Sequence, residues 1–152
     1  MKIIVDADSC PKNARELILR TVNRKGIKAF FAANRPIPGV EGENSQMIIC
    51  PAVKNSADDR IFEIAEKGDL AISRDLALAK RLLDKDVNII DDRGRAITKD
   101  NINVLLSMRN FTVNLAENGL GTERAPQYGK KELKRFADSL DRRLTKLERE
   151  KF

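Results

Sequence analysis

The sequence predicts a single α/β domain with a mostly parallel sheet and helices on both faces. Short apolar segments alternate with segments in which apolar residues recur every three or four positions, a pattern typical of strands joined by crossover helices. The chain has 152 residues, about the size of one domain. Within this domain we expect an α/β core over about residues 1–95 and a helical extension over about residues 99–152.

Apolar runs and helix-terminating residues mark the elements of the first part of the chain. The runs predict strands at 2–6, at 27–32 and at Met47–Cys50. Between the first two strands, Pro11 suits the first turn of a helix, and apolar residues at helical spacing continue the helix to Gly26. The loop before the third strand is rich in proline and glycine and is long enough to be functional.

The second part of the core repeats the alternation of helices and strands. A helix is expected from Ser56, which suits the N-cap, to Lys67, because Gly68 is a typical helix terminator. Strands are expected at 70–73 and 87–90, separated by a helix from about Leu76 to Asp84. With the three earlier strands, this gives a five-stranded, mostly parallel sheet.

The extension is predicted to be helical. One helix is expected from Asn101 to about Leu115, then a loop from Gly119 to Pro126, and then a long charged helix over Gly129–Phe152. The long helix carries nine bases and five acids, a net charge of +4, and this basic surface is compatible with contacts to a nucleic-acid strand or with ordinary solvation. One apolar stripe should dock it on the domain: Leu133, Phe136, Leu140, Leu144 and Leu147.

Acidic residues follow three of the predicted strands. Asp6 ends the first strand, Asp75 follows the fourth and Asp91 follows the fifth. Carboxyl ends of parallel strands meet at one edge of a sheet, so these acids should lie near one another. Carboxylates that converge repel each other unless a divalent cation lies between them. The sequence therefore predicts a metal site, although Asp75 would also suit the N-cap of the next helix.

Further acids lie at helix starts. Asp8 follows Asp6 closely and either joins the site or caps the first helix. With Ser56 as N-cap, Asp58 falls on the inward stripe of its helix, whereas Asp59 points away and completes a capping box. The candidate metal ligands are therefore Asp6, Asp8, Asp58, Asp59, Asp75 and Asp91, and the candidate catalytic residues are Asp6, Asp58, Asp75 and Asp91.

The absence of histidine restricts the chemistry. Without it, the chain has no Ser-His-Asp triad, no imidazole base and no His-ligated metal. Cys10 and Cys50 are too few for a four-ligand zinc site, and we expect both to be reduced. Oxygen ligands favour Mg²⁺ or Mn²⁺ as the cofactor.

The composition favours a cytoplasmic protein that binds nucleic acid. Hydrophobic residues make up 41% and charged residues 34% of the chain, and the net charge is +6. No apolar run approaches the length of about 20 residues that spans a bilayer, and no signal peptide is expected. An excess of bases can bind an anionic polymer, or it can simply be solvated. The basic residues nearest the acids are the candidates for nucleic-acid binding: Lys12, Arg15, Arg74, Arg93 and Arg95.

Several motifs together resemble the bacterial YaiI/YqxD family over nearly the whole chain. They are Asp6–Ala7–Asp8–Ser9–Cys10–Pro11, Ala57–Asp58–Asp59–Arg60–Ile61, Gly68–Asp69–Leu70–Ala71–Ile72–Ser73–Arg74–Asp75, Asp91–Asp92–Arg93–Gly94, Asn101–Ile102, Met108–Arg109 and Phe136–Ala137–Asp138–Ser139–Leu140–Asp141. That family is similar to the PIN-like nucleases, which use clustered acids and Mg²⁺ or Mn²⁺ to cut RNA.

This resemblance implies a PIN-like domain with strand order 3-2-1-4-5. Asp6 and Asp75 match the strand-end acids of such nucleases, Asp58 or Asp59 matches the helix acid, and Asp91 is a fourth candidate. The chain departs from the family pattern at Glu123–Tyr128, where a Gly-Gly-Pro stretch is usual, and at Ser9, where alanine is more usual.

Our leading hypothesis is metal-dependent hydrolysis of phosphodiester bonds, with RNA favoured as the substrate. One alternative is a haloacid-dehalogenase-like phosphatase, with Asp6 as nucleophile and Ser73, Lys80 and Asp91–Asp92 in supporting roles. A response-regulator receiver would need an acid at the end of the third strand, where Cys50 and Pro51 stand. A third possibility is a non-catalytic RNA-binding or protein-interaction module that keeps the acids for folding.

Overall fold

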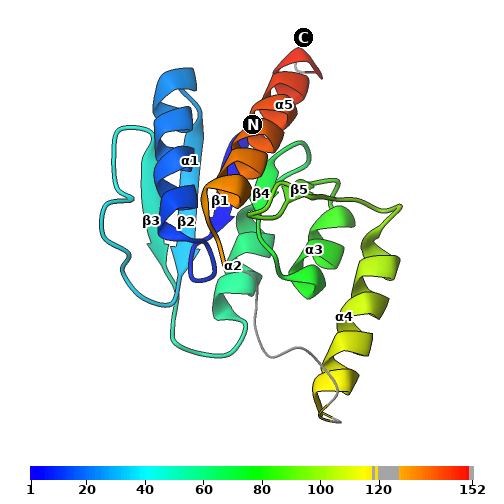
Figure 1. Cartoon of the computed structure of the whole chain (residues 1–152). Coiled ribbons are helices and arrows are strands. Elements are labelled where there is room, and N and C mark those ends of the chain that lie inside the picture. Colours follow the sequence, from blue (N-terminus) through cyan, green and yellow to red (C-terminus); the bar gives the residue numbers. More distant parts are fainter. Residues whose placement is uncertain (118, 120–126, 151–152) are drawn as a thin grey trace.

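The computed structural model describes residues 1–117, 119 and 127–150 and shows a six-stranded sheet between two layers of helices (Figure 1). The strands are β1 (Lys2–Asp6), β2 (Lys28–Ala33), β3 (Ser45–Ile49), β4 (Leu70–Ile72), β5 (Asn88–Ile90) and β6 (Ala96–Ile97). The helices are α1 (Lys12–Lys25), α2 (Ser56–Ile64), α3 (Leu76–Leu83), α4 (Ile102–Glu117) and α5 (Lys130–Glu150).

The strand order is β3-β2-β1-β4-β5-β6. The first five strands pair in parallel, which confirms the predicted mostly parallel sheet and its order over these strands. The expectation of five strands was wrong, because β6 adds a sixth that pairs antiparallel with β5. β6 has only two residues, too few to show the alternation that reveals a strand in a sequence.

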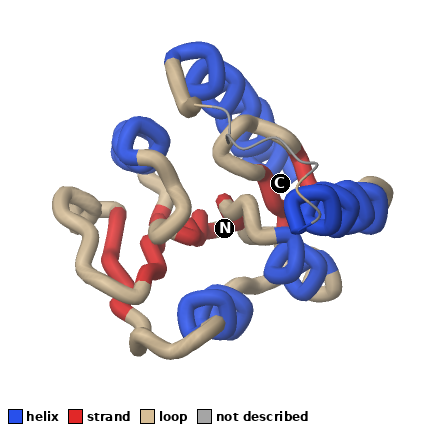
Figure 2. The backbone as a smooth tube through the Cα atoms, turned by 60° about the horizontal axis from the view of Figure 1, so that its bottom comes forward, coloured by secondary structure: helices blue, strands red, loops and turns tan. Residues whose placement is uncertain are grey.

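Helices cover both faces of the sheet, as predicted (Figure 2). Ile3 and Val5 of β1 point to the face covered by α1 and α5, and Ile4 points to the face covered by α2, α3 and the start of α4. The alternation follows from the pleat of a strand, which directs successive side chains to opposite faces. Because β1 is buried on both sides, it reads as an uninterrupted apolar run rather than as an alternating one.

Helix α2 differs from its prediction at both ends. Its N-cap is Asn55, with φ of 65°, and the Ser56 hydroxyl instead donates to the carbonyl of Pro51 and to Asn34 Oδ1 (3.1 Å). The Ser56–Asp59 capping box is therefore absent. The helix also ends at Ile64 rather than at Lys67, because Ala65 is extended and the amide of Glu66 donates to Asp69 Oδ2 (2.8 Å).

The long C-terminal helix docks on the domain as its apolar stripe predicted. Phe136, Leu140, Leu144 and Leu147 are buried in the same core as α1 and β1. The backbone of the β5–β6 turn also lies very close to the backbone of this helix. Gly94 in that turn has φ of 88°, and a Cβ there would lie 2.5 Å from the carbonyl oxygen of Arg135. Only glycine fits this contact. Of the loop expected over Gly119–Pro126, residues 120–126 lie outside the described residues, as does the predicted helix end at 151–152.

Over the part of the chain that the structure describes, no helix combines the length and the apolar character needed to cross a lipid bilayer.

The docking of α5 can be tested by truncating its central aromatic residue. Phe136 has no exposed surface, so Phe136→Ala should lower the free energy of unfolding by about 3–5 kcal/mol, measured by urea denaturation. Phe111→Ala is the matched control, because that side chain on α4 is 64% exposed and its loss should change stability by less than about 1 kcal/mol. Similar effects for both variants would contradict the docking of α5 described above.

Candidate acid site at the carboxyl edge of the sheet

Three carboxylates from three separate elements come together above the carboxyl ends of β1 and β4. Asp6 is the last residue of β1, and Asp75 follows β4 at the start of α3. Val5 is opposite Ile72 in the parallel register, so the two strands end side by side. Asp58 reaches this edge from the first turn of α2. We call Asp6, Asp58 and Asp75 the acid site.

Asp6 is the most buried member of the acid site, with 9% of its surface exposed. Its Oδ2 atom accepts hydrogen bonds from the hydroxyl of Ser73 (3.0 Å) and from the hydroxyl of Ser9 (3.3 Å). Burial raises the pKa of Asp6, the bond from Ser73 opposes the increase, and the charge of Asp75 adds to it. The hydroxyls therefore hold in place a carboxylate whose charge is poorly solvated.

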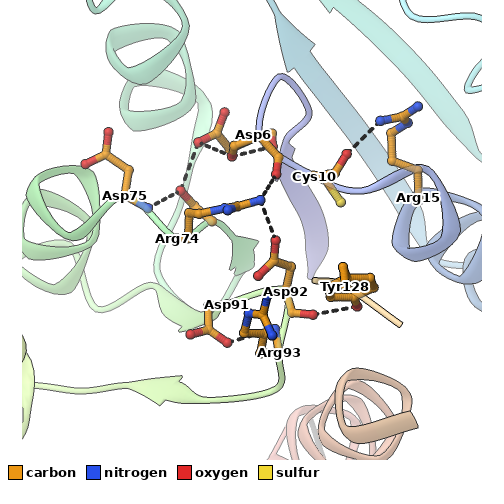
Figure 3. A network of polar contacts seen from close by, with 11 residues as sticks. Asp6, Cys10, Arg15, Arg74, Asp75, Asp91, Asp92, Arg93 and Tyr128 are labelled. Carbon is orange, nitrogen blue, oxygen red and sulfur yellow. Dashed lines mark hydrogen bonds and ion pairs between the residues drawn. The ribbon is translucent and has the colours of Figure 1, made fainter. Parts of the chain in front are cut away.

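Ser73 connects two members of the site. While its hydroxyl donates to Asp6, its oxygen accepts a hydrogen bond from the amide of Asp75 (3.0 Å). Asp75 in turn caps α3, because its Oδ1 atom accepts from the amide of Leu78 (3.1 Å). The capping role expected for Asp75 is confirmed, and it fixes the direction of the carboxylate. Figure 3 shows Asp6 and Asp75 on either side of this connection.

Asp58 shows how closely the three charges interact. Its pKa is raised to about 6, first by burial, then by the charges of Asp75 and Asp6, and by a hydrogen bond with Asp75. Only a protonated Asp58 can donate such a bond to a carboxylate, so the bond favours the neutral form. Arg81 opposes the increase only in part. The site thus binds a proton more readily than isolated carboxylates would.

In the described part of the chain, no basic side chain forms an ion pair with a member of the acid site. Among the described residues, Asp6, Asp58 and Asp75 make no ion pair, whereas their neighbour Asp59 pairs with Arg81 at 2.8 Å. In the same part of the chain, no three Asp, Glu or Cys side chains are grouped tightly enough to form a ready-made metal site. The arrangement therefore concentrates negative charge without a cation of the protein's own.

Two of the predicted ligands point elsewhere. Asp8 is exposed, and its carboxylate accepts from the amide of Asn34 (2.9 Å) and lies 4.0 Å from the Nε atom of Arg35. It does not cap α1, whose N-cap Pro11 has no side-chain cap. Asp59 is exposed and held by Arg81. The predicted difference between Asp58 and Asp59 is therefore found in the structure, although the N-cap is Asn55 and not Ser56.

Asp91 closes the turn between β5 and β6 instead of joining the acid site. Its Oδ1 atom accepts from the amides of Arg93 (3.0 Å) and Arg95 (2.9 Å), and its Oδ2 atom lies 3.3 Å from Arg95 Nε. With both oxygens engaged in this way, Asp91 has the contacts of a structural residue. In sequence, a turn-forming acid after a strand cannot be distinguished from a ligand.

A contact that the sequence did not reveal joins the two loops at this edge. Arg74 donates to the carbonyl of Ser9 and pairs with Asp92 Oδ2 (3.0 Å). The hydroxyl of Tyr128 donates to the carbonyl of Asp92 (2.6 Å), which ties the segment before α5 to the same turn. Figure 3 shows Arg74 lying between the loop after Asp6 and the turn that carries Asp92.

The basic residues predicted to bind nucleic acid have mixed roles. Arg15 donates to the carbonyl of Cys10 (2.6 Å), and Arg95 pairs with Asp91. Arg93 lies 3.8 Å from Glu132 and stacks on the Tyr128 ring. Lys12 is exposed at the start of α1. Arg15, Arg74, Arg93 and Arg95 thus help to hold the loops around the site.

Cys10 lies near the site but is unsuited to nucleophilic chemistry. It is buried, and burial together with the nearby charge of Asp92 raises the pKa of its thiol to about 12. A reactive cysteine needs the opposite shift, because the thiolate is the nucleophile. The shift of its pKa therefore gives Cys10 the character of a core residue.

The chain matches the model of a family described as "Uncharacterized BCR, YaiI/YqxD family" over residues 4–146. It is 45% identical to a UPF0178 protein of Treponema denticola over 96% of this chain and 93% of the relative. It is 38% identical to the UPF0178 protein PA5247 of Pseudomonas aeruginosa over 99% and 94% of the two chains. No solved structure matches the chain.

The charge interaction in the acid site predicts a pH-dependent stability. A carboxyl group whose pKa is raised on folding stabilises the protein below the unfolded pKa, and this stabilisation is lost as the pH rises through the folded value, about 6 for Asp58. Asp58→Asn, which cannot ionise, should match the wild type in stability near pH 4 and be more stable above pH 7. Thermal melting across this range measures the difference.

Asp59→Asn is the control for this comparison. It removes a carboxylate from the adjacent position but breaks the pair with Arg81, so it should not stabilise the protein at pH 7. A stability difference between Asp58→Asn and wild type that stays constant from pH 4 to pH 8 would contradict the charge interaction described for the acid site.

Proposed function

Because the chain belongs to the YaiI/YqxD family, and because of the geometry of its acid site, we propose that it is a PIN-like nuclease. It would hydrolyse phosphodiester bonds with the help of Mg²⁺ or Mn²⁺, and RNA is the substrate we favour. The observation that carries this proposal is the acid site, in which three carboxylates from β1, α2 and the start of α3 lie close enough for the charges of Asp6 and Asp75 to raise the pKa of Asp58. Among the described residues, none of the three forms an ion pair with a base.

A divalent cation is the simplest partner for such a group. Carboxylates that are close together and partly buried raise one another's pKa, because burial and repulsion disfavour their ionised form. A bound cation would offset this unfavourable free energy of ionisation. If the acids served only folding, an arginine or a lysine would be expected among them, as Arg74 is beside Asp92 and Arg95 beside Asp91. Those pairs lie at the same edge, so basic residues are available there but do not enter the acid site.

The ligand types fit Mg²⁺ or Mn²⁺. Both metals prefer oxygen donors, and Mg²⁺ usually keeps several waters and binds through one or two carboxylates together with substrate phosphates. The absence of a tight three-ligand group among the described residues is thus compatible with this cofactor. Asp6, Asp58 and Asp75 would hold the ion, which would polarise water and offset the charge of the phosphate.

The protein's own side chains would prepare this site in distinct ways. Ser9 and Ser73 orient Asp6, and the N-terminal end of α3 fixes Asp75 through the amide of Leu78. In the absence of a cation the pKa of Asp58 is about 6, so this carboxylate is mainly ionised at neutral pH and would be available as a ligand. This role requires no histidine.

The geometry gives less support to the alternatives. A haloacid-dehalogenase-like phosphatase would need the Asp91–Asp92 pair as metal ligands, but Arg95 and Arg74 bind those carboxylates. A non-catalytic binding module would not need a group of acids whose charges repel one another at the carboxyl edge of the sheet. A cleavage assay with Mn²⁺ distinguishes such a binding module from a nuclease.

Loss of one acid should abolish most of the activity while leaving the fold intact. Asp75→Asn is the most informative variant, because asparagine caps a helix as well as aspartate but cannot offer a charged ligand. On single-stranded RNA with Mn²⁺, its kcat/KM should fall by about 100-fold or more, the scale expected for lost electrostatic stabilisation. In the same series, Mn²⁺ should raise the melting temperature of the wild type but not that of Asp75→Asn.

Asp84→Asn is the control, because this exposed acid caps the other end of α3 and lies away from the carboxyl edge. It should keep both the activity and the response to Mn²⁺. If wild-type protein neither cleaves RNA nor responds to Mn²⁺ or Mg²⁺, the enzyme proposal fails and the binding module is favoured.

A further inference from the structure

A basic groove runs between the edge strand β6 and helix α5, apart from the acid site. It has a volume of about 360 Å³ and is lined by Gly94, Ala96, Ser139, Arg142, Arg143 and Lys146. Three of these six residues are bases and none is an acid. Among the described residues, Arg142, Arg143 and Lys146 make no ion pair, so no carboxylate neutralises them there; Arg143 also lines the neighbouring pocket beside Ile97 and Thr98.

The opposite side of α5 shows that this segregation is not a general property of the helix. The groove between α5 and α1 is lined by two bases, Arg20 and Arg24, and by two acids, Asp138 and Asp141. Arg24 lies 3.9 Å from Asp141, so charge is balanced there. The excess of positive charge therefore gathers on the side of α5 that faces β6.

The spacing of residues along α5 produces this groove. Ser139, Arg142, Arg143 and Lys146 are separated by three, four and seven positions, which places them on one face of the helix. The buried stripe from Phe136 to Leu147 lies beside that face and fixes its direction. The missing side chain of Gly94 lets the β5–β6 turn approach Arg135 and Ser139, which closes one end of the groove.

The groove starts at the edge of the sheet that carries the acid site. Gly94 belongs to the turn that begins with Asp91 and Asp92, and Arg74 links Asp92 to the loop after Asp6. β4 and β6 are two strand spacings apart, or about 10 Å. A polymer lying in the groove would therefore lead toward the acid site.

We propose that this groove binds the sugar–phosphate backbone of a single nucleic-acid strand. The proposal extends the nuclease proposed above and rests on it for the placement of the strand's reactive bond at the acid site. Arginine and lysine contacts to phosphate hold a strand without reading its sequence. No aromatic residue lines the groove, so recognition depends on charge rather than on base stacking.

Binding can be measured without cleavage by fluorescence anisotropy of a labelled single-stranded RNA in EDTA. Arg142→Ala/Lys146→Ala removes two exposed bases of the groove and should weaken binding about 10-fold at moderate salt. The slope of log K against log salt concentration should become shallower by about 1.4, since each phosphate contact on a single strand contributes about 0.7.

Two further variants test whether weaker RNA binding comes from the groove itself rather than from a lower net charge or from misfolding. Arg20→Ala/Arg24→Ala removes the same number of charges from α1, in the groove on the other side of α5, and should leave the salt slope unchanged. Arg142→Lys/Lys146→Arg keeps both cations and should bind like the wild type. Equal weakening by the two alanine pairs, or no binding of RNA by the wild type, would overturn the proposal.

The outcomes also distinguish this inference from the proposed activity. If the groove binds RNA but Mn²⁺ and Mg²⁺ never support cleavage, the nuclease proposal fails and the groove remains. If RNA is cleaved but Arg142→Ala/Lys146→Ala binds it with wild-type affinity and salt slope, the strand takes another path and the groove proposal fails.

Discussion

The repulsion among the carboxylates of Asp6, Asp58 and Asp75 is the constraint that organises this protein's candidate site. Each carboxylate is placed by an element whose position is fixed by packing: the central strand β1, helix α2 and the cap of α3. Because the elements cannot separate without exposing the core, the acids stay close and their charges raise the pKa of Asp58 to about 6. A fold that holds like charges together stores an affinity for protons or for cations.

Hydrogen bonds from two serine residues stabilise the charged carboxylate of Asp6. The hydroxyl of Ser73 donates to Asp6 and its oxygen accepts from the amide of Asp75, so one side chain orients two acids. Ser9 adds a second donor to Asp6. These bonds stabilise the charged form of Asp6 without neutralising it, which a basic residue would do. The carboxylate of Asp6 thus stays hydrogen-bonded while it is buried.

The rest of the edge is held by a different kind of contact. Arg74 and Asp92 connect the loop after β1 to the β5–β6 turn, Arg95 and Asp91 close that turn, and Tyr128 ties it to the segment before α5. Acid–base pairs therefore connect the loops at this edge, whereas the three acids of the acid site form no ion pair among the described residues. The same turn carries Gly94, whose lack of a side chain allows α5 to approach, so the frame of the acid site and the seat of the basic groove share one structural element.

The features of this fold that depend on short stretches of sequence were predictable, and those that depend on distant segments were not. The core strands, the helices between them and the buried stripe of α5 were predictable, because apolar periodicity and helix-terminating residues act over a few positions. The inward direction of Asp58 was also predictable, since it depends on helical geometry, although the cap assigned to Ser56 was wrong. The strand β6 was not predictable, because two residues carry no periodic pattern and pair only through a partner strand.

The sequence by itself determined that acids would follow several parallel strands and meet at one edge. Only the tertiary structure decided which of them would face one another. Asp75 and Asp91 both follow strands, yet the charge of the first raises the pKa of Asp6, while the second is held by Arg95 and by the amides of its own turn. The physical reason is that a carboxylate takes the hydrogen bonds and charges that folding brings within reach, and those partners lie on segments distant in the chain or in turns whose shape depends on the whole fold.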